Sequence, residues 1–338
     1  MDILREYGSK ILYHALISLG VVRVMRRLNR DKWAVLMYHN IVPDECPIDA
    51  WTLVRESAFR KQMELLKQHY DVVPIGDLIH DTIDRSQALR KSYKPKAVIT
   101  FDDGYRNNYT VALPILKEFN FPATVFVCSG FLNSTNMAWY DKVIYAIQRS
   151  SCNQIELDRK TYSFKHPRRD GRWDRINTLL TDLKAKTGHE RAVIVEEIET
   201  TLQVEHDQNE CFAFLSDGEV KEMHQSGLIT IGAHTANHEL LTQVSLEEAE
   251  KTVMKNYQDL RTIIDHDVFF ISYPNGNYNM KILELMHALP FKAACTTKSD
   301  LYSRKYTVFE VPRIGVGGYD SNANLLIKMS GLKKMLSL

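Results

Sequence analysis

"AVITFDDGYRNN", residues 97–108, joins a run of apolar β-forming residues to two adjacent carboxylates and a glycine. The run predicts a buried strand over residues 96–101, and Asp102 and Asp103 follow directly at its end. Neighbouring anions raise each other's proton affinity unless a positive charge lies close by. A metal ion, a basic side chain or solvent can compensate the pair, so this strand end is a candidate functional site.

Short apolar runs alternate with stretches of helical periodicity along most of the 338-residue chain. Strands are expected at residues 33–38, 71–75, 96–101, 123–127, 228–233, 268–274 and 291–297. Helices are expected at residues 56–69, 107–119, 216–227, 245–264 and 279–289. Repeated strand–helix units form a parallel sheet covered by helices. About seven strands favour an α/β barrel, complete or incomplete, over an open sheet.

Residues 133–215 interrupt this alternation. They hold a helix, a hairpin, the basic stretch 165–175 and two charged helices. We expect a mainly helical insertion that acts as a lid or subdomain within a domain spanning residues 33–338. The basic stretch fits a solvated loop, and contact with an anionic polymer is the alternative.

Residues 1–32 predict an amphipathic helix with a basic end. Its apolar part, residues 11–25, is shorter and more polar than a comfortable membrane span. No small-residue cleavage site follows it, so a cleaved signal peptide is not expected. Packing on the body of the protein, contact of residues 1–30 with a membrane surface, and an uncleaved anchor all stay open.

The composition is that of an ordinary globular protein, with 44% hydrophobic and 25% charged residues. A net charge of +1 gives no reason to expect a nucleic-acid partner. The scattered cysteines Cys46, Cys128, Cys152, Cys211 and Cys295 form no CxxC pair, so we expect reduced thiols and a reducing compartment. A cytoplasmic protein is therefore expected, with a peripheral position at the inner membrane as the alternative. The sequence does not predict the oligomeric state.

Polar side chains follow several expected strands at the point where each strand ends. The carboxyl ends of parallel strands meet at one rim of the sheet, where sites of such folds lie. The residues that fall there are His39, Asp102, Asp103, His234, His238, Pro274, Asn275, Gly276 and Arg313. Their convergence, rather than any one of them, predicts a site at this rim.

His234 and His238 lie four residues apart just after the strand at 228–233. This spacing lets both imidazoles reach one centre, and with one carboxylate they make a two-His, one-Asp metal site that keeps positions open for water. One aspartate then binds the metal, whose charge keeps both ionised, and the other takes a proton from the activated water. The pattern predicts metal-assisted hydrolysis, with the amide of Tyr105 placed to donate to an oxyanion.

These motifs resemble the polysaccharide deacetylases of carbohydrate esterase family 4, which carry the NodB-homology domain. The resemblance rests on "TFDDG" at 100–104 followed by "HTANH" at 234–238, with "YPNG" at 273–276 as a looser match. "LMYHNI" at 36–41 is similar to the exopolysaccharide-associated subgroup, which includes poly-N-acetylglucosamine deacetylases. The resemblance implies a distorted (β/α)7-type barrel and hydrolysis of N-acetyl groups from the amino sugars of a polysaccharide or glycan.

The resemblance also implies roles for individual residues. Asp103, His234 and His238 match the residues that hold a divalent metal, most often zinc, with Co²⁺, Ni²⁺, Mn²⁺ or Fe²⁺ as alternatives. Asp102 matches the general base. The arginine that braces this base in the family is missing before residue 274, and Arg313 is the candidate replacement.

Two further departures concern the acid and the substrate. Asn275 stands where the family usually has an aromatic residue, and with Pro274 and Tyr105 it is a candidate for substrate or oxyanion binding. The family's late Leu-x-His motif, which supplies the general acid, has no clear match, since "LMH" at 285–287 lies inside a helical run. His39 is the candidate acid, and a bracing role for it is the alternative.

Trp139, Tyr140 and Asp141 start the insertion and can line a sugar groove, and core packing is the alternative for the two aromatic residues. Tyr105 and Tyr278 elsewhere in the chain can do the same. The expected partner is an N-acetylated glycan. The alternatives are a lipid-linked or nucleotide-linked sugar precursor as substrate, an iron oxygenase with the same ligand set, and a non-catalytic glycan-binding protein.

Overall fold

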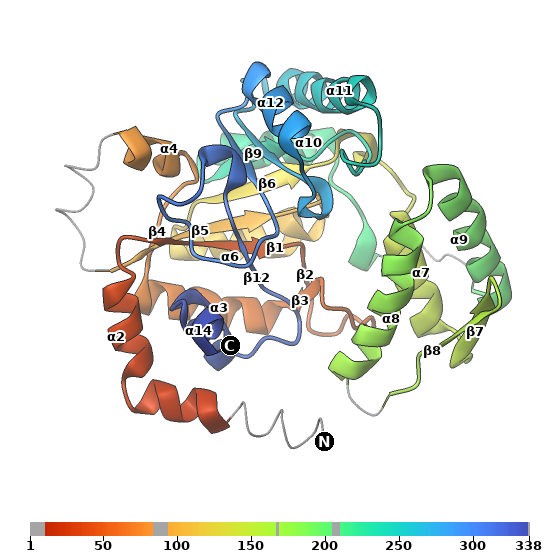
Figure 1. Ribbon diagram of the computed structural model, residues 1–338, viewed down its shortest axis with the longest axis horizontal. Coiled ribbons are helices and arrows are strands. Elements are labelled where there is room, and N and C mark those ends of the chain that lie inside the picture. The colour runs from red at the N-terminus through yellow and green to blue at the C-terminus, as the bar shows by residue number, and fades with distance from the viewer. Residues whose placement is uncertain (1–10, 84–93, 167–168, 205–209, 337–338) are drawn as a thin grey trace.

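The computed structural model describes residues 11–83, 94–166, 169–204 and 210–336. Its centre is a parallel sheet in the order β11 (Ala293–Cys295), β10 (Phe270–Ser272), β9 (Ile229–Ala233), β6 (Ala123–Val127), β5 (Lys96–Phe101), β1 (Trp33–Tyr38) and β12 (Ile314–Gly315). The short strand β4 (Asp71–Val72) pairs with the start of β5. Figure 1 shows the helices around this sheet and a separate helical lobe at one side.

One short segment joins the two edges of the sheet. Val311 forms a parallel bridge with Cys295 of β11, and three residues later Ile314 and then Gly315 pair with β1. The sheet therefore curls into a distorted barrel, as the number of strands predicts, and the segment 311–315 runs across the gap between its edges.

The strands are buried on both faces because helices cover the outside and the barrel interior is filled. β1 and β6 are buried at every position, as expected for parallel strands in which both faces are covered. Val35, Val98 and Phe126 belong to a small inner cluster. Leu36, Ile99 and the residues beside them face the larger outer core.

Helices pack on that outer core. They are α3 (Glu56–His69), α6 (Leu113–Phe119), α10 (Asp217–Gln225), α11 (Leu246–Ile264) and α12 (Met280–Ala288), whereas α4 (Gly76–Ile83) packs through Leu78 against the inner cluster. Ser216 and Glu219 form the capping box that their spacing predicts at the start of α10. Pro114 lies in the first turn of α6, where its missing N–H is not needed. A π-helical turn at Asn108–Ala112 precedes it.

The lobe consists of α7 (Trp139–Arg149), the hairpin β7 (Gln154–Leu157) and β8 (Lys160–Ser163), α8 (Arg169–Lys184) and α9 (Gly188–Leu202). The hairpin and the helices agree with the elements expected between 133 and 215. Ile147, Leu179 and Ile198 pack in a core of the lobe's own. That core also takes in residues of the loop around β2 (Asn40–Val42) and β3 (Leu53–Arg55), which connects the lobe to the barrel.

The expectation that all five cysteines are reduced is wrong for two of them. Cys46 and Cys211 form a disulfide, with their Cα atoms 6.7 Å apart. They are separated by 165 residues in sequence, and only the fold brings them together. Cys128, Cys152 and Cys295 are free thiols, of which the first and third are buried.

The N-terminal segment is two helices rather than one. Residues 11–18 are helical, Gly20 breaks the path with a φ of 75°, and α2 runs from Val21 to Leu28. Residues 1–10 of the helix expected over 1–32 lie outside the described residues. α2 packs beside the C-terminal helices α13 (Asn322–Met329) and α14 (Leu332–Leu336). No helix in the described ranges is long and apolar enough for a membrane span.

Candidate metal and catalytic site

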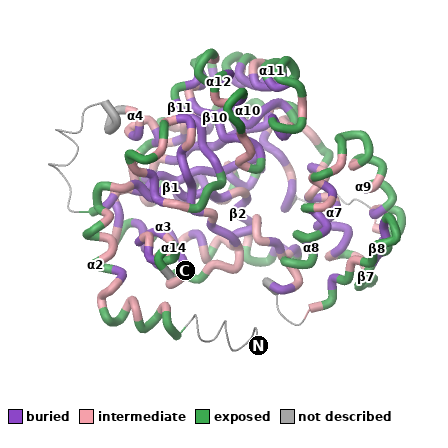
Figure 2. The backbone as a smooth tube through the Cα atoms, viewed as in Figure 1, coloured by how far each residue is buried: buried purple, intermediate pink, exposed green. Residues whose placement is uncertain are grey.

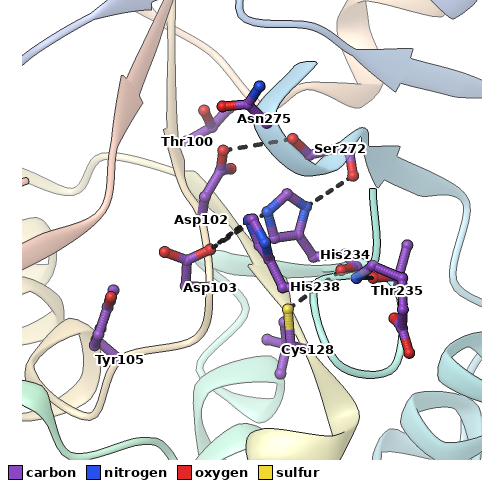
Figure 3. Close-up of polar contacts among 12 residues, drawn as sticks. Thr100, Asp102, Asp103, Tyr105, Cys128, His234, Thr235, His238, Ser272 and Asn275 are labelled. Carbon is purple, nitrogen blue, oxygen red and sulfur yellow. Dashed lines mark hydrogen bonds and ion pairs between the residues drawn. The ribbon is translucent and has the colours of Figure 1, made fainter. Parts of the chain in front are cut away.

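The rim at the carboxyl ends of the strands gathers the predicted polar residues. Asp102 and Asp103 leave β5, His234 and His238 follow β9, and Ser272 ends β10. Figure 3 shows these side chains pointing toward one another. The backbone N–H of Asp102 still donates to the carbonyl of Tyr38, 3.0 Å away, so the first carboxylate is held by the sheet itself.

Asp103, His234 and His238 form one compact cluster. Asp103 Oδ1 lies 3.4 Å from His234 Nε2 and 3.6 Å from His238 Nε2. The three ligand atoms all lie within 4.8 Å of one another. Each residue offers one atom to the same point, which is the donor set and convergence of a two-His, one-carboxylate metal centre.

Unusual backbone conformations build this cluster. Asp103 has a φ of 75° and His238 a φ of 58°, both in the left-handed region that non-glycine residues rarely adopt. Gly104 continues the turn with a φ of 82°, and a Cβ there would lie 3.1 Å from Val127. The chain thus turns sharply behind Asp103, in the way the DDG sequence predicts.

The surroundings of His234 fix its orientation. Its Nδ1–H donates to the backbone carbonyl of Ser272 at 2.7 Å, so Nε2 is the ring atom that faces Asp103. Its backbone N–H donates to Asn256 Oδ1 at 2.9 Å. Such outer hydrogen bonds select the tautomer of metal-binding histidines.

The cluster fits a divalent metal by a second observation. Asp103 Oδ1 is buried and accepts no hydrogen bond from any described residue. A buried carboxylate oxygen without a donor is costly, and a cation between it and the two imidazoles would remove that cost. Burial works against ionisation of Asp103, yet His234 and His238 outweigh it and hold the pKa below its usual value.

Asp102 has a different partner. Arg313 donates from Nη1 to Asp102 Oδ1 and from Nη2 to Oδ2, each at 2.7 Å. The same guanidinium donates to Ser272 Oγ at 2.7 Å, to Thr100 Oγ1 at 3.1 Å and to the carbonyl of Thr296 at 2.9 Å. Arg313 is fully buried and lies on the segment that joins the barrel edges. The fold therefore brings the candidate replacement arginine to the candidate base.

The guanidinium decides the charge of Asp102. Burial alone raises the pKa of this carboxyl, but the attraction and hydrogen bonds of Arg313, with His234, hold it below its ordinary value. Asp102 is therefore ionised at neutral pH. The negative charges of the two adjacent carboxylates are therefore compensated separately. The basic side chain of Arg313 compensates Asp102, and Asp103 faces the two imidazoles.

His39 lies beside this network. Its ring packs edge-on against Trp51, with centroids 5.7 Å apart, and its buried Nδ1 has no partner among the described residues. Burial lowers the pKa of His39, although Asp103 and Asp102 act in the opposite sense. The imidazole is neutral at neutral pH, so an acid at this position must gain its proton during the reaction.

The comparison with known families decides the identity. Residues 90–294 match the family described as polysaccharide deacetylase. The chain belongs to the polysaccharide deacetylase family. This match confirms the resemblance drawn from the motifs. It also confirms the prediction of a carbohydrate de-N-acetylase, and the iron-oxygenase alternative is therefore wrong.

One relative of this deacetylase matches most of the chain at low identity, and another matches a shorter stretch at higher identity. YxkH of Bacillus subtilis (strain 168), whose name assigns it to the polysaccharide deacetylases, is 21% identical over 288 residues, 84% of this chain and 71% of that protein. The poly-beta-1,6-N-acetyl-D-glucosamine N-deacetylase of Escherichia coli (strain K12) is 37% identical over 93 residues, 27% of this chain and 13% of that enzyme.

Solved structures confirm the fold. The Streptococcus pyogenes deacetylase PplD in complex with acetate has a TM-score of 0.58 at 20% identity, covering 88% of this chain and 98% of its own. IcaB from Ammonifex degensii has a TM-score of 0.57 at 16% identity, covering 89% and 97%. The distorted barrel of the deacetylase is therefore the expected NodB-type fold.

The side chain of Tyr105 does not line a sugar groove. It is 1% exposed, stacks on Phe214 with centroids 5.2 Å apart, and donates from its hydroxyl to Asp141 Oδ2 at 2.8 Å. Asp141 is itself buried. Both residues join barrel and lobe, so the groove-lining alternative is wrong for them.

The backbone of Tyr105 keeps its predicted place. Arg106 N–H donates to the Ala213 carbonyl and Leu215 N–H donates to the Gly104 carbonyl. In this antiparallel pattern the Tyr105 N–H points away from the facing strand. The amide thus remains the candidate oxyanion donor next to the DDG turn.

Other aromatic residues have mixed positions. Tyr140 packs edge-on against His238, with centroids 5.5 Å apart, so it borders the metal cluster. Trp139 is partly buried in the lobe core beneath Arg191. Tyr278 stacks on Tyr273, away from that cluster in the contacts described.

The lobe adds a residue to the rim that sequence reasoning missed. Lys184, at the end of α8, donates to Asn275 Oδ1 at 2.8 Å. Its carbonyl accepts from Gln243 Nε2 at 3.0 Å. Pro274 is buried, whereas Asn275 is exposed with a φ of 56°. A basic side chain of the insertion therefore meets the third motif. No sequence signal distinguishes Lys184 from the charged residues around it.

Proposed function

We propose that this chain is a metal-dependent hydrolase that removes N-acetyl groups from the amino sugars of an exopolysaccharide or envelope glycan. The observation that carries the proposal is that the two adjacent carboxylates have different partners and can therefore play different roles. Asp103 faces two imidazoles at 3.4 and 3.6 Å, and Asp102 is held ionised by Arg313. A site built in this way offers both a metal position and a separate base.

In this proposal Asp103, His234 and His238 hold the metal, and zinc is the first choice for two imidazoles and one carboxylate. Co²⁺, Ni²⁺, Mn²⁺ and Fe²⁺ suit the same donors. When bound, the ion supplies a Lewis acid that polarises the acetyl carbonyl and lowers the pKa of water.

The other residues act around that centre. Asp102 accepts the proton of the attacking water, because its carboxylate keeps free lone pairs while Arg313 orients it. The N–H of Tyr105 donates to the oxyanion that develops on the acetyl carbonyl. Because His39 is neutral before the reaction, the proton that Asp102 takes from the water passes on to His39, which gives it to the nitrogen of the leaving amine as the C–N bond breaks. The products are acetate and a free amino sugar.

The name of the Escherichia coli relative supports a polymer of N-acetylglucosamine as substrate. A lipid-linked or nucleotide-linked precursor is the other candidate of the same chemistry. A cytoplasmic location remains a proposal. The expectation of a reducing compartment was based on five reduced cysteines, and the disulfide between Cys46 and Cys211 removes that basis.

Acetate release from N-acetylglucosamine oligomers tests the proposal. Wild-type enzyme is stripped with a chelator and then restored with zinc. The proposal expects release that disappears with the metal and returns with it. Zinc-loaded enzyme that releases acetate from neither oligomers nor lipid-linked nor nucleotide-linked N-acetyl sugars would contradict it.

A further inference from the structure

Solvent-exposed large apolar side chains gather at the N-terminal helices. Nine such side chains occur among the described residues, and five of them lie between residues 11 and 28. Leu19 is 78% exposed and Leu28 is 68% exposed. Exposed apolar side chains scattered singly need no explanation, but a local concentration marks an interaction surface.

These helices already have a core contact, so the exposed side chains are a second apolar face. Val22 is buried against Ile327 and Leu332 of the C-terminal helices. Asn29 Nδ2 donates to the Ser330 carbonyl at 2.8 Å just after α2. Figure 2 shows the rest of the segment exposed or half-buried along the edge of the molecule. The segment is anchored on one side and uncovered on the other.

A basic pocket of about 410 Å³ opens beside the exposed face. Its lining contains the cationic or basic side chains Arg23, Arg26, Arg27, His69 and Lys94, together with Gln68 and Pro95. None of the described residues that line it is acidic. In the ranges that the structure describes, no acidic side chain forms an ion pair with any of the three arginines.

Two side chains show an excess of positive charge among the described residues of the pocket. The Nε atom of Arg26 is buried without a described hydrogen-bond partner, although its Nη1 donates to the His69 carbonyl at 3.3 Å. The pKa of His69 is lowered first by burial and then by Arg26 and Lys94. A negatively charged group in the pocket would satisfy these donors.

The exposed apolar and basic residues are neighbours on α2. Val24 and Leu28 are four residues apart and share one flank of the helix, while Arg23 and Arg27 share the adjacent flank. This arrangement is typical of a helix that lies in a membrane interface, with apolar side chains among the acyl chains and arginines at the phosphate level.

We propose that residues 11–28 dock this enzyme on an anionic lipid bilayer, with Leu19, Val24 and Leu28 entering the interface and the arginine pocket receiving a lipid phosphate. Charge favours this occupant over a second copy of the chain. A two-fold contact through α2 would bring Arg23 and Arg27 of both copies together, and like charges at an interface repel.

Vesicle co-sedimentation tests the proposal on the full-length enzyme. Phosphatidylcholine vesicles are compared with vesicles in which part of that lipid is replaced by phosphatidylglycerol. We expect binding to the anionic vesicles that weakens as salt is added. Replacing Arg23 and Arg27 by alanine should weaken it about 25-fold, at roughly fivefold for each arginine near the surface.

Matched variants separate docking from folding. Leu19→Ser with Val24→Ser and Leu28→Ser should also lose vesicle binding. A control variant carries similar changes on α11, which lies away from α2 in Figure 1: Leu246→Ser, Lys251→Ala and Lys255→Ala. This control should bind the anionic vesicles as the wild type does. All three variants should keep the circular dichroism spectrum of the wild type and its rate of acetate release from soluble oligomers.

Four results would overturn the proposal. One is equal sedimentation of the wild type with neutral and anionic vesicles. Another is unchanged binding in both the arginine and the apolar variants. The third is a concentration-dependent dimer that the apolar substitutions dissolve, since it assigns the face to a second copy. The fourth is stabilisation of the protein by inorganic phosphate without any vesicle binding, since it limits the pocket to a soluble anion.

Discussion

Arg313 and Asp102 form a fully buried, bidentate ion pair, although they lie 211 residues apart in sequence. The pairing depends on the segment that joins the two edges of the barrel, because that segment carries Arg313 into the interior. The segment that closes the barrel therefore also supplies the residue that keeps the proposed base ionised.

Replacing Arg313 should damage both stability and activity. Arg313→Ala leaves Asp102 buried without its counter-charge, which costs about 3–5 kcal/mol of unfolding free energy. Arg313→Lys retains the charge but not the planar fork, so it should fall between alanine and wild type. Urea unfolding and acetate release provide the measurements.

A matched control uses Arg106, which pairs with Glu219 at 2.8 Å but is half exposed. Arg106→Ala should cost no more than about 1 kcal/mol. Equal losses in Arg106→Ala and Arg313→Ala would refute the special role of the buried pair.

Stability of the metal-free enzyme should fall as the pH drops below the range of an ordinary histidine. Burial lowers the pKa of His238 to about 4 in the folded protein, whereas an unfolded histidine titrates near 6.5. The unfolded chain therefore binds a proton first, and stability present above pH ~6.5 is lost toward pH ~4, at up to ~1.4 kcal/mol per pH unit. His238→Gln should show a shallower slope in urea unfolding, and an unchanged slope would contradict the assignment.

Lys184 should affect substrate binding more than chemistry. Its hydrogen bond to Asn275 connects the lobe to the rim, and one such bond contributes about 0.5–1.5 kcal/mol. Lys184→Ala is expected to raise the KM for oligomers about 2–10-fold with a smaller change in kcat. Lys186→Ala, which removes only an ion pair with Asp158, is the control, and identical kinetics in the two variants would argue against the contact.

The disulfide should stabilise the junction of barrel and lobe. Replacing Cys46 and Cys211 by serine is expected to lower the unfolding free energy by about 2–4 kcal/mol. Cys152→Ser alters an exposed free thiol and should change little. If reduction and the double substitution both leave the unfolding midpoint unchanged, the bond contributes nothing to stability.

The sequence predicted the barrel and the rim because both follow from local patterns. Strand ends are recognisable from apolar runs, and the parallel sheet then brings Asp103, His234 and His238 together. Arg313 could be proposed because a strand was expected to end just before it, but residues 308–310 form a 3-10 turn and Arg313 lies immediately before β12.

The remaining features depend on tertiary contacts that leave no local pattern. The Cys46–Cys211 bond joins distant loops, and Lys184 resembles any other charged helix residue until the lobe is placed. Tyr105 is buried by Phe214, which arrives from the far end of the insertion. The helix break at Gly20 was missed because the apolar pattern continues across it.

The most direct test of the central claim compares Asp102→Asn with Asp103→Asn, with bound zinc and acetate release measured in the same samples. The account predicts that Asp102→Asn keeps stoichiometric zinc and loses about 10²–10⁴ in kcat, because only the base is removed. Asp103→Asn should lose the zinc and with it the activity. Loss of zinc in Asp102→Asn, or full activity with zinc retained in either variant, would contradict the division of labour between the two carboxylates.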